Sequence, residues 1–191
     1  MATDTRTRMI EATARLIQAR GLHGVSLNDI LEASGAPRGS LYFHFPGGKT
    51  DLVLEAVRAG VEEASRVLRD CLEAADGPAE GIRRFFQAAA GEMSESGYAF
   101  GCPVAPIVLD MPEEESALAE ACQASFEEWM AMYRDALVAA GLRPARAVTL
   151  ARTIISSLEG ALILARSERD TTTIADVGNE MAALIENAMR S

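Results

Sequence analysis

Residues 25–52 read VSLNDILEASGAPRGSLYFHFPGGKTDL, and this stretch decides the fold of the N-terminal part of the chain. Ser26 precedes an apolar turn and has Asp29 three residues later, which is a variant of the capping box that begins a helix. Pro37 follows a glycine-containing break and suits the first turn of a new helix, where a missing N–H has no partner to lose. The run Pro-Gly-Gly at 46–48 ends this helix. The sequence therefore predicts a helix-turn-helix.

Helical periodicity continues outward from this stretch, whereas the alternation typical of strands is scarce. The sequence predicts an all-α chain of about nine helices, with a three-helix helix-turn-helix domain at 1–48 and a C-terminal bundle for ligand binding and dimerisation at 49–191. Pro112 and the acids Glu113–Glu115 are expected to open the seventh helix. The expected helices cover residues 4–20, 27–34, 37–43, 49–75, 78–94, 107–110, 112–140, 144–166 and 173–189.

Charge is divided unevenly along the 191 residues. The formal net charge is −10, which taken alone argues against a nucleic-acid partner. Residues 1–50, however, hold six basic and four acidic side chains, a net of +2, so the remainder carries −12. A mildly basic segment joined to a strongly acidic body indicates two roles in one chain.

The helix-turn-helix stretch resembles the DNA-binding domain of the TetR family of bacterial transcriptional regulators over residues 6–55. Its most specific part is SLYFHF at 40–45, followed by Lys49 and Leu52. A second string, GCPVAPIVLD at 101–110, resembles a subgroup related to lincomycin-resistance repressors, some of which respond to flavonoid-like compounds. The resemblance implies a homodimer that binds a double-stranded DNA operator and responds to a small-molecule effector.

The residues themselves are suited to DNA contact. A helix that enters the major groove needs small or polar leading residues and an apolar back face, here provided by Leu41 and Phe45. Tyrosine, histidine and lysine side chains donate to phosphates, and free N–H groups at a helix N-terminus donate to phosphate oxygens. The candidate DNA-binding residues are Ser26, Asn28, Arg38, Gly39, Ser40, Tyr42, His44 and Lys49.

Structural roles compete with several of these contacts. Tyr42 is alternatively half-buried in the core, His44 a local cap, and Ser26 a helix cap first and a phosphate ligand second. Phe43 is expected in the core together with Phe45. Arg6 and Arg8 follow the DNA backbone or only form a solvated face.

Aromatic and methionine side chains gather in the acidic body. Phe126, Trp129, Met130 and Tyr133 recur at three- and four-residue spacing and so share one helix face. Ordinary core packing accounts for such a face, but tryptophan and tyrosine also carry polar tips that suit a flat, amphipathic ligand. The proline- and glycine-rich break at 101–106 is expected to line the cavity. The candidate ligand-binding residues are Phe85, Phe100, Cys102, Pro103, Phe126, Trp129, Met130 and Tyr133.

The helix at 144–166 carries two apolar stripes, more than one core requires, and the final helix repeats a further apolar stripe. Two such helices from each of two protomers form a four-helix interface, and a twofold dimer presents two recognition helices to a pseudo-palindromic operator. The alternative is that both stripes belong to the core of one chain. The candidate interface residues are Ile154, Ser157, Leu158, Ala161, Leu164, Val177, Met181 and Leu184.

The leading hypothesis is a repressor released from its operator by a small apolar or aromatic ligand. The alternative is a redox-sensing regulator that uses Cys71, Cys102 or Cys122. An enzyme is not expected, since the sequence holds two histidines and no HExxH, GxSxG or GxGxxG motif. No metal site, cofactor, signal peptide or membrane span is expected, and unpaired cysteines indicate a reducing, cytoplasmic location.

Overall fold

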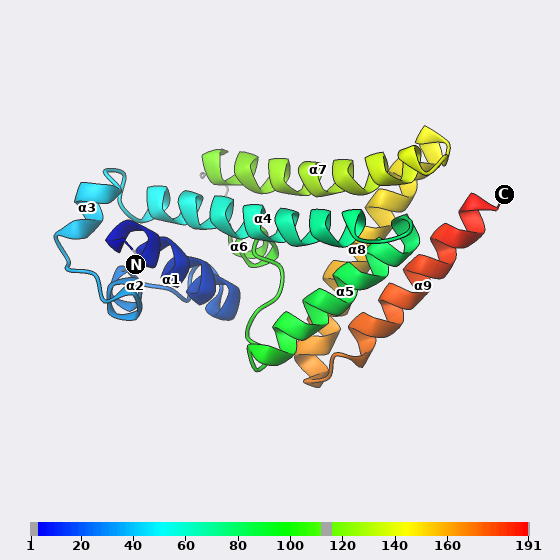
Figure 1. Cartoon of the computed structure of the whole chain (residues 1–191). Coiled ribbons are helices and arrows are strands. Elements are labelled where there is room, and N and C mark those ends of the chain that lie inside the picture. The colour runs from blue at the N-terminus through cyan, green and yellow to red at the C-terminus, as the bar shows by residue number, and fades with distance from the viewer. Residues whose placement is uncertain (1–3, 112–115, 191) are drawn as a thin grey trace. The chain divides into compact units, whose positions relative to one another are not determined.

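The computed structural model describes residues 4–111 and 116–190, and within these ranges the chain is helical without strands. This confirms the all-α prediction; the expected opening of the seventh helix at Pro112 and Glu113–Glu115 lies outside the described residues. The helices are α1 (Thr5–Arg20), α2 (Leu27–Ser34), α3 (Ser40–His44), α4 (Lys49–Glu73), α5 (Pro78–Glu95), α6 (Ala105–Asp110), α7 (Ser116–Ala139), α8 (Pro144–Glu168) and α9 (Thr172–Met189) (Figure 1).

The third helix begins later than the sequence suggested. Pro37 does not open α3; instead the N–H of Ser40 donates to the carbonyl of Pro37 at 2.9 Å, which closes a three-residue turn. Such a turn is tighter than an α-helical turn, and α3 proper starts only at Ser40. The expected helix at 37–43 was therefore wrong at its first residues.

The described residues divide into two compact units. Unit 1 comprises Met1–Glu63 and Cys102–Ser125, and unit 2 comprises Ala64–Gly101 and Phe126–Ser191. The boundaries between the units fall within α4 and α7, so the units differ from the predicted segments 1–48 and 49–191. That those two segments bind DNA and effector, respectively, stays a prediction. Each unit has a buried apolar core of its own.

Unit 1 is built around the helix-turn-helix, in which α1 packs on α2 and α6 contacts α1. Periodic apolar residues of α1, α2 and α4 supply its interior, as the sequence pattern predicted. Apolar burial of this kind contributes about 25 cal/mol per Å² and holds short helices that are marginal in isolation. The largest fully buried side chains of this unit include Met9, Ile17, Ile30, Phe45, Leu52 and Ile107.

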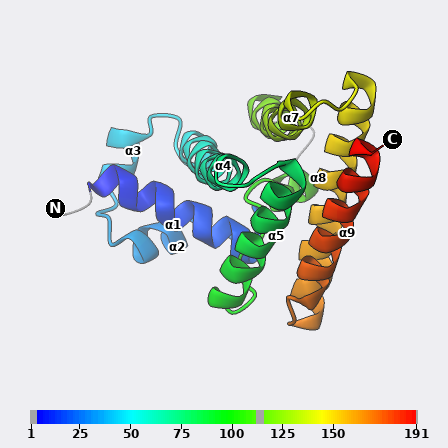
Figure 2. The same cartoon turned by 45° about the vertical axis from the view of Figure 1, so that its right-hand side comes forward.

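In unit 2, α5 packs along α9, and α8 packs on α9 (Figures 1 and 2). The approach of α5 to α9 is close at Gly178, where a Cβ atom would lie 2.7 Å from the Cβ of Phe86 and 3.0 Å from its Cγ. Gly178 is buried, and so is the Phe86 ring. Glycine at this position therefore sets the spacing of the two helices.

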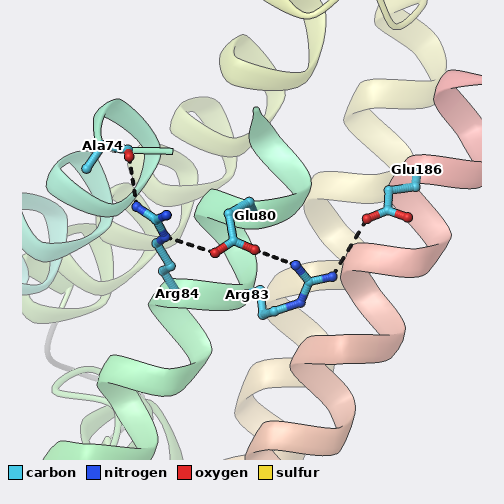
Figure 3. A network of polar contacts seen from close by, with 5 residues as sticks. All are labelled: Ala74, Glu80, Arg83, Arg84 and Glu186. Atoms are coloured by element: carbon cyan, nitrogen blue, oxygen red, sulfur yellow. Dashed lines mark hydrogen bonds and ion pairs between the residues drawn. The ribbon is translucent and has the colours of Figure 1, made fainter. Parts of the chain in front are cut away.

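A polar network ties α5 to its neighbours in unit 2 (Figure 3). Arg83 pairs with Glu80 on its own helix and reaches Glu186 of α9 at 3.7 Å. Arg84 donates to Glu80 at 2.9 Å and to the carbonyl of Ala74, just beyond the end of α4, at 2.7 Å. Hydrogen bonds from Arg84 and Arg83 lower the pKa of Glu80. The two arginines thus connect the end of α4, the start of α5 and the side of α9.

Among the described helices, α8 has the length and apolar composition that a membrane span requires. Length and composition do not distinguish a span from the core helix of a bundle. In this structure α8 packs on α9 and buries a stripe of eight residues, which is the pattern of a core helix.

Candidate functional site

The predicted DNA-binding surface begins at the N-terminus of α2. The hydroxyl of Ser26 accepts from the N–H of Asp29 at 3.2 Å, and the Asp29 carboxylate accepts from the N–H of Ser26 at 2.8 Å. This reciprocal pair is the capping box that the sequence indicated. Ser26 is exposed but already serves as the cap, whereas Asn28 on the first turn of α2 is exposed to solvent.

Helix α3 separates an inner from an outer face. Leu41 and Phe45, four residues apart, are each 2% exposed and pack into unit 1. Tyr42 is 65% exposed and Phe43 is 81% exposed. The expectation that Phe43 lies in the core was wrong, because at about 100° per residue it projects from the side of the helix opposite Leu41 and Phe45.

The residues that lead into α3 present little side-chain bulk. Arg38 and Gly39 are exposed, and Ser40 is half-buried. Gly39 has φ −69° and ψ −19°, ordinary helical values, and a Cβ atom built on it would meet nothing within 4 Å. Neither backbone conformation nor packing within the chain therefore requires glycine at this position.

Lys49, at the start of α4, makes contacts that the sequence did not reveal. Its ammonium donates to the backbone carbonyl of Val25 at 2.5 Å and to that of Leu22 at 3.3 Å. Both acceptors lie in the segment that joins α1 to α2. Lys49 therefore supports the segment that joins α1 to α2, and its contact with a phosphate stays a prediction.

The remaining candidates near this surface also have partners within unit 1. The His44 ring is half-buried and meets Phe43 edge-on, with the centroids 4.9 Å apart. Arg6 donates to Glu55 at 2.9 Å and stacks over the Phe45 ring at 5.4 Å. Arg6 is thus part of the folded domain rather than only a solvated side chain.

In unit 2, the predicted aromatic face of α7 is partly occupied by polar contacts. The buried indole N–H of Trp129 donates to the hydroxyl of Ser65 at 2.9 Å. Ser65, which is 2% exposed, donates in turn to the Glu128 carboxylate at 2.8 Å. Phe126 meets Trp129 edge-on at a centroid distance of 5.7 Å. The tryptophan is therefore fixed in position from two sides.

Tyr133 differs from Trp129 because its polar tip is unpaired. The side chain is fully buried, and its hydroxyl oxygen has no hydrogen-bond partner. Burial, with smaller contributions from Cys71 and Glu159, raises the pKa of Tyr133, so the phenol stays neutral. The Phe85 ring lies edge-on to it at 6.4 Å. A buried hydroxyl without a hydrogen-bond partner is costly, so Tyr133 is the unsatisfied polar group of this face.

The other candidate ligand residues are distributed over both units. Phe85, Phe100 and Met130 are half-buried residues of unit 2. Cys102 is buried and Pro103 half-buried, and both belong to unit 1, where a Cβ atom at Gly60 would lie 2.9 Å from Pro103. Their grouping with the aromatic face of α7 stays a prediction.

The candidate dimer residues fall into three classes by burial: buried, exposed and half-buried. Ile154, Leu158 and Ala161 are buried within unit 2 itself. Leu164 is 51% exposed, next to Ile163 at 61%. The half-buried members of the set are Ser157, Val177, Met181 and Leu184.

The three cysteines are free thiols. Burial raises the pKa of Cys71 and of Cys122, which disfavours thiolate formation. The sulfur of buried Cys102 accepts from the N–H groups of Val104 at 3.4 Å and Ala105 at 3.3 Å. A search of the described residues finds no group of three or more acidic, histidine or cysteine side chains placed to hold a metal ion.

Sequence reasoning missed two residues that shape these sites. Ser65 supplies the partner of the Trp129 indole, and Asp110 accepts from a backbone N–H in the α1–α2 turn. Each contact joins positions more than 60 residues apart, and a single serine or aspartate has no local pattern that signals such a role. The exposure of Phe43 did have a signal, because it lies two residues from both Leu41 and Phe45 on a helix.

Comparisons with known proteins agree with this architecture. Residues 9–56 match the family described as bacterial regulatory proteins, tetR family. Residues 78–180 match the C-terminal domain of LmrA/YxaF-like transcriptional regulators, which is more than half of the chain. The HTH-type transcriptional regulator LmrA of Bacillus subtilis (strain 168) is 33% identical over 183 residues, covering 96% of this chain and 97% of its own.

Solved structures share the fold. The TetR transcriptional regulator from Legionella pneumophila is 25% identical with a TM-score of 0.87, covering 96% of this chain and 99% of its own. The TetR-family regulator CifR, solved as a cysteine mutant with 26-bp operator DNA, is 23% identical with a TM-score of 0.76, covering all of this chain and 97% of its own. The family matches and the full-length relative together show that this chain belongs to the TetR family of DNA-binding transcriptional regulators and carries a C-terminal domain of the LmrA/YxaF-like type.

Proposed function

We propose that the protein is a repressor that binds a pseudo-palindromic operator as a homodimer and is released by a small apolar or aromatic effector. The observation that carries the DNA-binding part is α3 with the residues that lead into it: Arg38, Gly39 and Tyr42 are exposed, while Leu41 and Phe45 anchor the helix. This is the division of faces that a recognition helix requires.

The contacts follow from the exposed groups. Arg38 reaches a guanine edge or a phosphate, the Tyr42 hydroxyl donates to a phosphate, and Asn28 lies at the N-terminus of α2. Ser26 and Lys49 act first within the domain, as a cap and as a brace of the α1–α2 turn. The operator complex of the structurally similar CifR supports this use of the fold.

The test is binding of the full chain to a duplex that it selects from a random-sequence library. Arg38→Ala is expected to weaken binding about tenfold or more and to lower the slope of log K against log salt by about one. Arg143→Ala, which removes an exposed arginine of unit 2, is the matched control and should change neither. Undiminished binding by the Arg38 variant would refute the assignment of α3.

The proposed effector site is centred on Tyr133 in unit 2. Its neutral, unpaired hydroxyl and the neighbouring Phe85 ring suit an uncharged aromatic molecule with one hydrogen-bonding group. Charged ligands are disfavoured here, because a charge loses its hydration on entering an apolar site. A hydroxyflavone is a suitable probe, because residues 101–110 resemble a subgroup of regulators of which some respond to flavonoid-like compounds.

Calorimetric titration of the full chain with a hydroxyflavone tests the site. Tyr133→Phe removes only the hydroxyl and is expected to weaken binding by about 3-fold to 10-fold, the value of one hydrogen bond. Operator affinity should fall as the effector rises, because release requires tighter effector binding to the state that does not bind DNA. Operator binding that is unchanged at saturating effector would contradict release.

Dimerisation is proposed through α8 and α9. The exposed apolar side chains of Ile163 and Leu164 lie on α8, and Val177, Met181 and Leu184 form a half-buried stripe on α9. Leu164→Arg is expected to yield a monomer in analytical ultracentrifugation, since an interface core excludes an unpaired charge. Gln87→Arg, at an exposed position of α5 in the same unit, is the charge-matched comparison.

A redox-sensing regulator is the second candidate. The observation in its favour is Cys102, whose sulfur accepts two backbone N–H groups, an environment that stabilises a thiolate. Peroxide treatment followed by operator titration distinguishes the candidates: loss of binding in the native chain but not in Cys102→Ser would support a thiol switch. We place the protein in the cytoplasm and expect no enzymatic activity, as is usual for regulators of this family.

A further inference from the structure

We propose that Phe43 reads the 5-methyl group of a thymine in the operator. This inference rests on the proposed use of α3 as the recognition helix. Phe43 is the most exposed large apolar side chain of α3, at 81%, and it adjoins the exposed Tyr42. Covering such an exposed ring with an apolar group on binding is favourable.

Helix geometry directs Phe43 away from the domain. Taking Leu41 as zero, residues advance by about 100° along the helix, so Phe45 lies near 40° and Phe43 near 200°. Phe43 is thus about 180° from the middle of the buried face. A helix that docks with Leu41 and Phe45 inward presents Phe43 directly to whatever α3 meets.

Gly39 supplies an independent observation on the same face. It lies four residues before Phe43, so the two positions are adjacent along the outer side of the helix. Its φ of −69° needs no glycine, and a Cβ atom there would meet nothing in this chain. The absence of a side chain is therefore explained by close approach of an external surface. Together the two residues form a flat, uncharged area.

The His44 ring lies against the Phe43 ring. The two rings meet edge-on at 80° with centroids 4.9 Å apart, and His44 is itself half-buried. A ring that already packs against a neighbouring ring loses less side-chain entropy when it contacts DNA.

Duplex DNA offers one apolar group on its major-groove edges. Guanine, cytosine and adenine present hydrogen-bond donors and acceptors there, whereas thymine adds the 5-methyl group, which phenylalanine contacts. Phe43 has no donor or acceptor, so it distinguishes thymine from the other bases by apolar contact alone. The exposed Arg38 at the start of the same helix turn supplies attraction to the phosphates.

Replacement of single thymines by deoxyuridine tests this directly, because it removes the methyl group and leaves every hydrogen-bonding atom in place. With a duplex selected from a random library by the full chain, one such replacement in each half-site is expected to weaken binding by about 15-fold, because each of the two methyl groups removed contributes about fourfold. Phe43→Ala should bind the thymine and deoxyuridine duplexes equally.

Leu109→Ala is the matched control, since Leu109 is an apolar residue of unit 1 with 79% exposure that is not on α3. It should keep the preference for thymine, and both variants should melt like the native chain. If no thymine replacement weakens native binding, or if Phe43→Ala retains the preference, the inference is overturned. Failure to select any duplex would instead overturn the proposed function.

A uniform weakening of all duplexes by Phe43→Ala, with the preference for thymine unchanged, would show that the ring touches the sugar-phosphate backbone and would also overturn the inference. If Tyr42→Ala loses the preference for thymine and Phe43→Ala keeps it, the contact belongs to Tyr42 and the inference is overturned. The inference is supported if the preference for thymine disappears in Phe43→Ala and persists in Tyr42→Ala and Leu109→Ala.

Discussion

The carboxylate of Asp110, the last residue of α6, accepts a 2.8 Å hydrogen bond from the backbone N–H of Leu22. The carbonyl of Leu22 accepts from Lys49 at 3.3 Å, so one peptide segment of the α1–α2 turn is held through both of its polar groups. Gly21 precedes it with φ +76°, and a Cβ atom there would overlap the Asp110 carboxylate. Glycine is thus required here both by conformation and by the approach of α6.

Removal of this carboxylate is expected to loosen the turn. Asp110→Ala leaves the partly buried Leu22 N–H without its acceptor, which should lower the free energy of unfolding by about 1–3 kcal/mol. Hydrogen exchange at the Leu22 amide should accelerate accordingly. Asp110→Asn retains an acceptor oxygen and should keep most of the protection. Equal exchange rates in all three proteins would show that the contact contributes nothing in solution.

Ser65 is expected to matter through Trp129. Ser65→Ala leaves the buried indole N–H without a partner and should destabilise the protein by about 1–3 kcal/mol in urea unfolding. Because Trp129 is the sole tryptophan, its emission reports the change without interference. Ser125→Ala is a useful comparison, since that buried hydroxyl donates only to Ala121 of its own helix, at 2.7 Å, and its loss should cost less.

Tyr133→Phe is expected to have opposite effects on stability and on effector binding. Without ligand, the substitution removes a buried hydroxyl that has no partner, so the free energy of unfolding should rise by about 1 kcal/mol or stay unchanged. Tyr42→Phe, at an exposed position, should leave stability as it is. A clear loss of stability in the Tyr133 variant would mean that an ordered water satisfies the hydroxyl.

The contact between α5 and α9 should be sensitive to a single methyl group. Gly178→Ala places a Cβ atom 2.7 Å from that of Phe86 and is expected to cost about 1–3 kcal/mol through overpacking. Gly91→Ala makes the same change on the open side of α5, where nothing lies within 4 Å. It should stabilise the helix by roughly 0.5–1 kcal/mol. Thermal melts of both variants give the comparison.

The capping box predicts a pH effect at α2. Hydrogen bonds from the Ser26 side chain and backbone lower the pKa of Asp29 below its usual value. A carboxylate whose pKa is lower in the folded state contributes stability above its unfolded pKa of about 3.9, and this is lost as the pH falls through the folded pKa. Ser26→Ala should raise the Asp29 pKa in an NMR titration; an unchanged value would exclude the box in solution.

The helix-turn-helix could be predicted because its signals are local. The Ser26–Asp29 box and the inward pair Leu41 and Phe45 are encoded by neighbours within one or two turns. The sequence predicted a phosphate contact for Lys49 but not its hydrogen bonds to backbone carbonyls, because those depend on how the α1–α2 turn folds. The pairings of Trp129 with Ser65 and of Asp110 with Leu22 were inaccessible, because tertiary packing alone brings these residues together.

The pairing of Arg6 with Glu55, and of Arg20 with Asp29 at 3.6 Å, has a consequence for how the protein searches a chromosome. Two of the six basic side chains among the first fifty residues already face carboxylates, which leaves four to release counterions from arbitrary DNA. Dwell times on random sequence should therefore be short. A regulator with this property redistributes quickly among genomic sites and leaves a large free pool to reoccupy a vacated promoter.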